Sequence, residues 1–216
     1  MRELVRVGAS VLLCVWLGRP APIGAHRLDE YLQAARIAVD VDRVGVELDL
    51  TPGVAIAPSV LAMIDRDRNG EITGDEGDAY ARQVIEGLVM DVDGHAVRAR
   101  LEEQTMPVWR DVAEGTGVIR LRASAALSRL GSGRHQLYFQ NVHRSEIGVY
   151  LVNALVPADD RIEITGQRRD AAQHELTIDF HVRGARRFGA AWSALAGFLV
   201  AATIGLVSVR RRAGTR

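Results

Sequence analysis

The stretch DRDRNGEITGDE, at residues 65–76, spaces oxygen-bearing side chains as a hard metal ion requires. Counted from its first residue, side-chain oxygens stand at positions 1, 3, 5, 9 and 12, and position 7 offers its backbone carbonyl. Such a set, closed by a carboxylate that gives both oxygens, suits calcium better than the smaller magnesium ion. The sequence therefore predicts calcium as a cofactor. Its predicted ligands are Asp65, Asp67, Asn69, Glu71, Thr73 and Glu76.

Three further features of this stretch agree with a calcium-binding loop. Gly70 stands at position 6, where the sharp turn needs a backbone conformation that a Cβ atom disfavours. Ile72, at position 8, is apolar and is predicted to pack into the domain. Thr73 and Glu76 also form the T-x-x-E pattern of a capping box, so we expect a helix to begin here.

Helices are predicted on both sides of the loop. Residues 57–64, APSVLAMI, carry Pro58 near the first helical position and last two turns. Residues 75–88 repeat small and apolar residues at helical spacing. The expected buried stripe of that helix consists of Ala79, Ala81, Val84 and Leu88. The whole unit, residues 57–88, resembles the EF-hand family, and the resemblance implies calcium binding by the loop.

In one respect the unit departs from that family, because EF-hands usually pair and the sequence holds no second loop. The nearest candidate, DVDGHAVRARLE at residues 91–102, has Gly94 at its fourth position instead of the sixth. A lone loop predicts weak calcium affinity, in the ~0.1–1 mM range of extracellular modules. A structural calcium clip suits that affinity better than a sensor does.

Much of the remaining chain alternates apolar and polar residues with period two, as half-buried strands do. Residues 36–50 form one predicted hairpin around Asp42 and Arg43, and residues 88–101 form another around Asp93-Gly94. Later strands are predicted in VIRLRAS, HQLYFQNV, VYLVNALV, RIEIT and HELTIDFHV. Eight or nine strands separated by turns predict a mainly β fold, an antiparallel β-sandwich with the helix–loop–helix inserted between strands.

The two ends of the chain predict export and a membrane anchor. Residues 1–25 have a basic start, a short apolar run and a small-residue cleavage site, as a signal peptide does; an uncleaved anchor is the alternative. Residues 188–209 are uncharged and, at about 1.5 Å per residue, long enough for one transmembrane helix. The basic tail, residues 210–216, then lies in the cytoplasm, and residues 26–187 form a periplasmic domain anchored in the bacterial cytoplasmic membrane.

Composition excludes several other functions. The 27 basic and 27 acidic residues cancel, so the chain lacks the basic excess of a nucleic-acid binder. Every basic residue is arginine, which excludes a Schiff-base or P-loop lysine, and no glycine-rich loop predicts a bound nucleotide. Cys14 lies in the predicted signal peptide, so the mature chain is expected to have neither disulfides nor thiolate metal ligands.

A second resemblance concerns the exported body as a whole. The run AHRLDEYLQAARIAV, the EF-hand-like insertion and the later run VYLVNALVP resemble the exported N-terminal part of bacterial membrane proteins related to the hydrogenase/urease accessory nickel permeases. Those proteins continue into a multi-helix transporter, whereas a single helix is predicted here. The resemblance implies a module that works beside a membrane protein or transporter.

Two other functions compete with calcium binding. Cleavage after Ala25 makes His26 the N-terminal residue, whose amine and imidazole can chelate a transition metal. A nickel, cobalt or copper accessory protein that uses His26 and other histidines is therefore the alternative. An exported hydrolase is a weaker one, because GSGRH at residues 131–135 lacks the strand–turn–helix setting of a nucleophile elbow. We predict no catalytic residues and no enzymatic activity.

Overall fold

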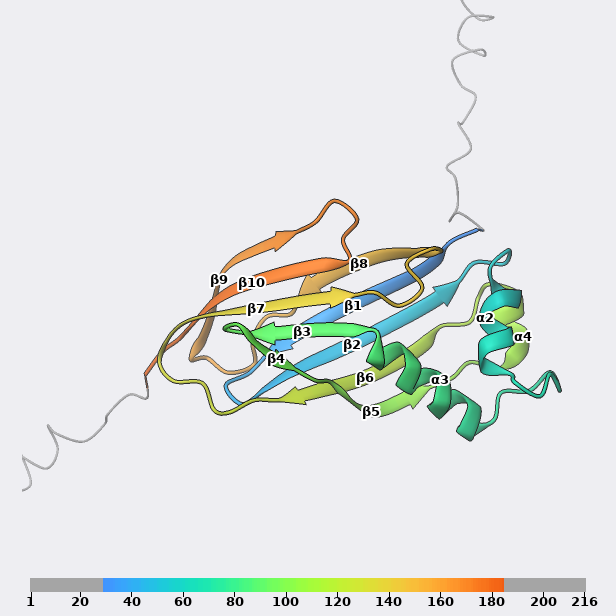
Figure 1. Cartoon of the computed structure of the whole chain (residues 1–216), viewed down its shortest axis with the longest axis horizontal. Coiled ribbons are helices and arrows are strands. Elements are labelled where there is room, and N and C mark those ends of the chain that lie inside the picture. Colours follow the sequence, from blue (N-terminus) through green and yellow to red (C-terminus); the bar gives the residue numbers. More distant parts are fainter. Residues whose placement is uncertain (1–28, 185–216) are drawn as a thin grey trace, which may run out of the picture.

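The polypeptide forms two five-stranded β-sheets that pack face to face (Figure 1). The structure, a computed structural model, describes residues 29–184. The first sheet has the strand order β5-β6-β2-β1-β8, and the second has the order β4-β3-β7-β10-β9. The strands are β1 (Tyr31–Val39), β2 (Arg43–Pro52), β3 (Leu88–Val92), β4 (His95–Val97), β5 (Arg100–Thr105), β6 (Ile119–Ala126), β7 (Gly133–Asn141), β8 (Gly148–Ala154), β9 (Ile162–Arg169) and β10 (Glu175–Val182).

Strict alternation of side chains builds the core between the two sheets. Every second residue of β1, β2 and β10 is buried, because successive side chains of a strand point to opposite faces. Leu48 from the first sheet joins Phe139 and Phe180 from the second in one apolar cluster. A mainly β fold with two sheets is therefore confirmed.

One strand pairing differs from the predicted antiparallel arrangement. β1 pairs with β2 in antiparallel register but with β8 in parallel register, Tyr31 opposite Gly148 and Ile37 opposite Ala154. The prediction that all strands are antiparallel is wrong at this pair. More than a hundred residues separate the two strands, so no hairpin turn dictates their relative direction.

The second predicted hairpin forms only in part. Asp93 and Gly94 make its turn with φ angles of 54° and 80°, as a two-residue hairpin turn of this kind requires. Its outgoing strand, however, is divided between the sheets. β4 pairs with β3 in the second sheet, whereas β5 leaves that sheet and pairs with β6 at the edge of the first. The chain therefore crosses between the two sheets at Arg98 and Ala99.

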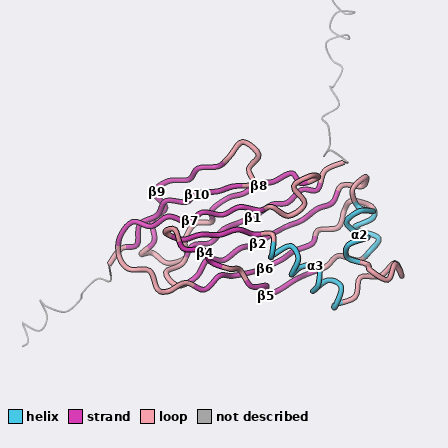
Figure 2. The backbone as a smooth tube through the Cα atoms, viewed as in Figure 1, coloured by secondary structure: helices cyan, strands magenta, loops and turns pink. Residues whose placement is uncertain are grey.

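Within residues 29–184, three helices accompany the sheets: α2 (Ala57–Ile64), α3 (Gly74–Glu86) and α4 (Trp109–Ala113). α2 and α4 lie at one end of the sandwich, and α3 runs beside the edge strand β5 (Figures 1 and 2). α2 has the predicted bounds, but the predicted buried stripe of α3 is wrong in part. The residues of α3 that are buried are Gly77, Tyr80, Ala81, Val84 and Ile85.

The predicted signal peptide, residues 1–25, and the predicted transmembrane helix, residues 188–209, lie outside the described residues. Across residues 29–184, no helix combines the length and the apolar character needed to cross a membrane. β10, the last described strand, ends at the end of the sandwich opposite α2 and α4 (Figure 1).

Candidate metal centre

The loop between α2 and α3 begins where α2 is anchored in the core. α2 buries Val60 and Ile64 against the sandwich, and its last turn ends at Asp65, whose backbone N–H donates to the carbonyl of Leu61 at 2.8 Å. Asp65 is only 5% exposed, so the first predicted ligand lies at the base of the loop. The core packing of α2 therefore fixes where the loop starts.

Backbone amides of the loop point inward at its polar side chains. Oδ1 of Asp65 accepts the amide N–H of Asn69, and Oδ2 accepts that of Gly70, each at 3.0 Å. Oδ1 of Asp67 also accepts from the Asn69 amide, at 3.1 Å, and Oδ1 of Asn69 accepts from the Glu71 amide at 2.8 Å. These hydrogen bonds therefore position the first three predicted ligand side chains of the loop.

Gly70 has the conformation for which the sequence predicts a glycine. Its φ is +82°, in the left-handed region, and a Cβ atom at this position would meet no atom within 4 Å. The requirement for glycine is therefore a matter of backbone conformation and not of space. Arg68 also has a positive φ, 61°, and its exposed side chain belongs to the outer side of the loop.

The end of the loop is closed by the predicted capping box. Oγ1 of Thr73 accepts the amide N–H of Glu76 at 3.4 Å, while Oε2 of Glu76 accepts from the amide and the hydroxyl of Thr73 at 3.0 and 2.8 Å. The other oxygen of Glu76 accepts the backbone N–H of Arg66 at 2.9 Å. Glu76 thus connects the start of α3 to the start of the loop, and the predicted helix start is confirmed.

Three carboxylates converge in this loop. One oxygen from each of Asp65, Asp67 and Glu76 lies within 4.8 Å of the other two, and residues 29–184 contain no other group of three His, Cys, Asp or Glu side chains that can hold a metal ion. None of the ion pairs formed among these residues involves the three carboxylates. The like charges repel one another, so a cation placed among them is favoured.

Hydrogen bonds keep two of these carboxylates ionised. Burial by itself raises the pKa of Asp65, but the amide hydrogen bonds from Gly70 and Asn69 outweigh it and lower that pKa below its usual value. The amide and hydroxyl of Thr73 likewise lower the pKa of Glu76. Since a metal ligand must be deprotonated, the loop presents these carboxylates in their binding form at neutral pH.

The remaining predicted loop residues take different places. Ile72 is partly buried and packs against the core, as expected. Glu71 and Thr73 are exposed. Only the backbone carbonyl of Glu71 was predicted to bind the ion, so exposure of its side chain agrees with that role. The structure therefore places all six predicted ligands on one loop and brings three of their side-chain carboxylates together, those of Asp65, Asp67 and Glu76.

A fourth side chain at the site was not predicted from the sequence. Nε1 of Trp109, in α4, donates a hydrogen bond to Oδ2 of Asp65 at 2.9 Å. The two residues are 44 positions apart, and nothing in the pattern of residues 107–111 indicates the contact.

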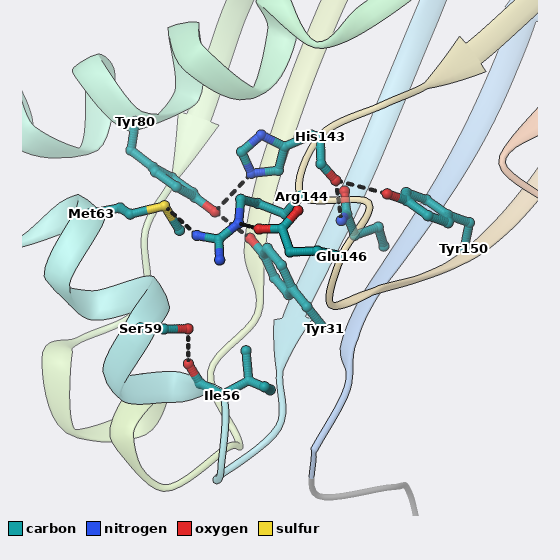
Figure 3. A network of polar contacts seen from close by, with 10 residues as sticks. Tyr31, Ile56, Ser59, Met63, Tyr80, His143, Arg144, Glu146 and Tyr150 are labelled. Atoms are coloured by element: carbon teal, nitrogen blue, oxygen red, sulfur yellow. Dashed lines mark hydrogen bonds and ion pairs between the residues drawn. The ribbon is translucent and has the colours of Figure 1, made fainter.

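Behind α3 lies a buried polar network that joins the helix to the sandwich (Figure 3). The hydroxyl of Tyr80 in α3 is 2.5 Å from that of Tyr31 in β1 and 3.3 Å from Nε2 of His143, which follows β7. Burial raises the pKa of Tyr80 to about 12. Burial, with a smaller effect of the Arg144 charge, lowers the pKa of His143 to about 4. Burial also raises the pKa of Tyr31, so all three rings are neutral at physiological pH.

The described histidines form no metal-binding group. His135 contacts Oδ2 of Asp93 through Nδ1 at 2.6 Å and the carbonyl of Gly131 through Nε2 at 3.0 Å. Because Nε2 is taken by a carbonyl, this Asp–His pair activates no hydroxyl nucleophile, which gives no support to the hydrolase alternative. His26 lies outside the described residues, so the transition-metal alternative stays a prediction.

Comparison of the chain with family models, curated proteins and solved structures finds no match. The resemblances to the EF-hand family and to the exported part of nickel-permease-like proteins therefore remain predictions from the sequence. What can be argued about function rests on the geometry of the loop and its surroundings.

Proposed function

We propose that residues 57–88 are a calcium-binding EF-hand and that the chain is an exported, membrane-anchored calcium-binding module. The observation that carries the proposal is the convergence of Asp65, Asp67 and Glu76 within 4.8 Å, and no ion pair within residues 29–184 involves any of them. Calcium accepts many oxygen ligands at flexible geometry, and this loop offers carboxylate, amide, hydroxyl and backbone oxygens. Soft metals prefer thiolate or imidazole ligands, which the loop lacks.

In this proposal, calcium ties α2 to α3. Asp65 ends α2 and Glu76 lies in the first turn of α3, so an ion held by both fixes the angle between the two helices. The gain in order is largest in the exposed part of the loop, where the hydrogen bonds of Asp67 and Asn69 are made to other residues of the loop. Binding then stabilises the folded domain, because the ion has no preformed site in the unfolded chain.

Both helices contact the segment that connects β7 to β8, and this is the surface we expect calcium to stabilise. Tyr80 of α3 contacts His143, and the Arg144 guanidinium donates to Sδ of Met63 in α2 at 2.8 Å (Figure 3). Val142 of the same segment is 43% exposed. A partner that contacts this segment therefore meets a surface whose order depends on the loop.

The partner we propose is a membrane protein or transporter with a part outside the bilayer. β10 ends opposite α2 and α4, and five residues separate it from the predicted membrane helix at residues 188–209. With this short connection, the calcium loop is expected to lie at the membrane-distal end of the domain. Its partner surface then faces a protein and not lipid headgroups.

Thermal unfolding of residues 26–187, which include the whole described core, tests calcium binding. With a dissociation constant near 1 mM, about 10 mM calcium is expected to stabilise the domain by about 1.4 kcal/mol. For a domain of this size the midpoint should rise by about 3–5 °C. Glu76→Gln should abolish most of that rise, because it removes one charge and one of the two closing oxygens.

A matched control is Glu86→Gln, the same change at an exposed position at the other end of α3. It should keep the full calcium response. If calcium changes the midpoint of thermal unfolding in neither the parent nor the control, the proposal is contradicted. A response to nickel or copper alone, lost on changing His26 in the full chain, would favour the transition-metal alternative.

A further inference from the structure

We propose that Trp109 is a positioning residue of the metal centre. Its indole N–H donates a hydrogen bond to Oδ2 of Asp65 and leaves Oδ1 as the calcium ligand. The inference rests on the proposed calcium-binding function and deepens it. It identifies which atom of the loop's first residue binds the ion and which distant residue decides this.

Each carboxylate oxygen has about two lone pairs that can accept a hydrogen bond or bind a metal. Oδ2 of Asp65 already accepts two N–H groups, from Gly70 at 3.0 Å and from Trp109 at 2.9 Å. Oδ1 accepts one, from Asn69 at 3.0 Å. The free acceptor site of this carboxylate is therefore on Oδ1, so Asp65 should bind the ion through one oxygen. Without the indole, Oδ2 would accept only the Gly70 amide, and the two oxygens would differ less in their free acceptor sites.

The indole is held in place by the packing of α4. Val112, fully buried, packs with Ala57 and Leu61 of α2, and Trp109 packs against the same cluster. Ile72 of the loop contacts this cluster as well. α4 thus supports both α2 and the loop, which is the support that a second EF-hand loop would otherwise give. The structure offers a physical reason why a single loop can be ordered here.

The chain that follows α4 is wound tightly, which fixes the backbone that carries the indole. The carbonyl of Asp111 accepts the amide N–H groups of Thr116 and Gly117 at 2.9 and 2.8 Å. A Cβ atom on Gly117 would lie 2.8 Å from the amide nitrogen of Val112. Gly115 has a φ of +71°, and a Cβ there would lie 2.7 Å from Cγ2 of Val54. The backbone that carries the donor is therefore held in place before the ion binds, which reduces the entropy lost on binding.

Calcium titration of the full chain in detergent micelles tests the role of the N–H group. The chain has three tryptophans, so a background of Trp16→Phe and Trp192→Phe leaves Trp109 as the only one. Trp109→Phe keeps an aromatic ring but removes the donor. Since loss of a group that orients a metal ligand costs 10- to 100-fold in affinity, we expect the calcium dissociation constant to rise at least about 10-fold. Val112→Ala is the comparison for packing on α4: it loosens the cluster but keeps the donor, so it should weaken calcium binding less than Trp109→Phe does.

The possible outcomes separate this inference from the function on which it rests. A parent that binds calcium with an affinity unchanged by Trp109→Phe overturns the role of Trp109 and leaves the calcium site standing. Equal weakening by Trp109→Phe and Val112→Ala also overturns it, because packing and not the N–H group is then responsible. A parent that binds no calcium overturns the proposed function and this inference together.

A second measurement does not depend on how the Trp109→Phe variant folds. In the background with one tryptophan, the indole N–H of Trp109 gives a single NMR cross-peak. We expect this proton to exchange slowly with solvent, and the cross-peak to shift during the calcium titration with the same midpoint as binding. A cross-peak that stays in place while calcium binds, or a proton that exchanges as fast as that of a free indole, contradicts the inference.

Discussion

Acid is expected to destabilise this protein through His143. The residue is 5% exposed, and its ring meets those of Tyr31 and Tyr80 edge-on at centroid distances of 6.2 and 5.8 Å. Both tyrosines are neutral, so neither offsets an imidazolium charge. Burial, and next the positive charge of Arg144, lower the pKa of His143 to about 4, while the nearby Glu146 carboxylate opposes them only weakly.

The size of the effect follows from the difference between the folded and the unfolded pKa. In the unfolded chain the imidazole has its ordinary pKa of 6.5. Between pH 6.5 and about pH 4 the unfolded state therefore binds more protons than the folded state, and stability decreases as the pH falls. At about 1.36 kcal/mol per pH unit, the fall in pH from the unfolded to the folded pKa lowers the free energy of unfolding by about 3 kcal/mol. The contribution is fully present above pH 6.5 and is lost on approaching the folded pKa.

Urea unfolding of residues 26–187 at several pH values between neutrality and the folded pKa measures this loss. His143→Phe keeps a ring of similar shape against the two tyrosines and cannot be protonated, so its stability should vary much less across the window. The backbone N–H and carbonyl of His143, which bond to Asn141 and Gln33, are unaffected by the substitution. His95→Phe, which removes an exposed histidine, should keep the slope of the parent.

Two results would refute this reasoning. One is a parent whose stability is constant between pH 6.5 and about 4.5, because a buried neutral imidazole must then be absent or must gain a partner on protonation. The other is a His143→Phe variant that loses stability as steeply as the parent, since the acid sensitivity then comes from other groups.

Three further substitutions test other parts of the structure. Gly70→Ala should destabilise the domain by about 1 kcal/mol, measured by urea unfolding, and should weaken calcium binding, because φ is +82° while the surrounding space is open. Tyr80→Phe should cost about 1–3 kcal/mol in the same assay, since it leaves the buried hydroxyl of Tyr31 without its 2.5 Å partner. Although burial lowers the pKa of His135, its hydrogen bond with Asp93 contributes to a net rise. The contribution of protonated His135 to stability is fully present below pH 6.5 and is lost as the pH rises through the folded pKa. The free energy of unfolding of His135→Gln should therefore change less than that of the parent as the pH rises above 6.5.

Features that depend on neighbours in the chain were predictable from the sequence. The α2 helix has its predicted bounds, because Pro58 and an apolar stripe act within two turns. The capping box between Thr73 and Glu76 forms as predicted, since its partners are three residues apart. Asp93-Gly94 makes the expected turn because glycine, and to a lesser degree aspartate, tolerates a positive φ. The loop's ligand spacing is likewise local, so the candidate site could be located without a structure.

Features that join distant residues were decided by the tertiary structure alone. No local pattern indicates that β8 pairs with β1 in parallel, or that the chain changes sheets between β4 and β5, because each pairing depends on which edge remains free once the core has formed. Trp109 reaches Asp65 across 44 residues, and Tyr80 reaches His143 across 63. The amino-acid sequence by itself therefore determined the ligands that calcium is proposed to use. Packing of α4 and α3 decided what holds those ligands in place, because such contacts arise only when distant segments are brought together in a common core.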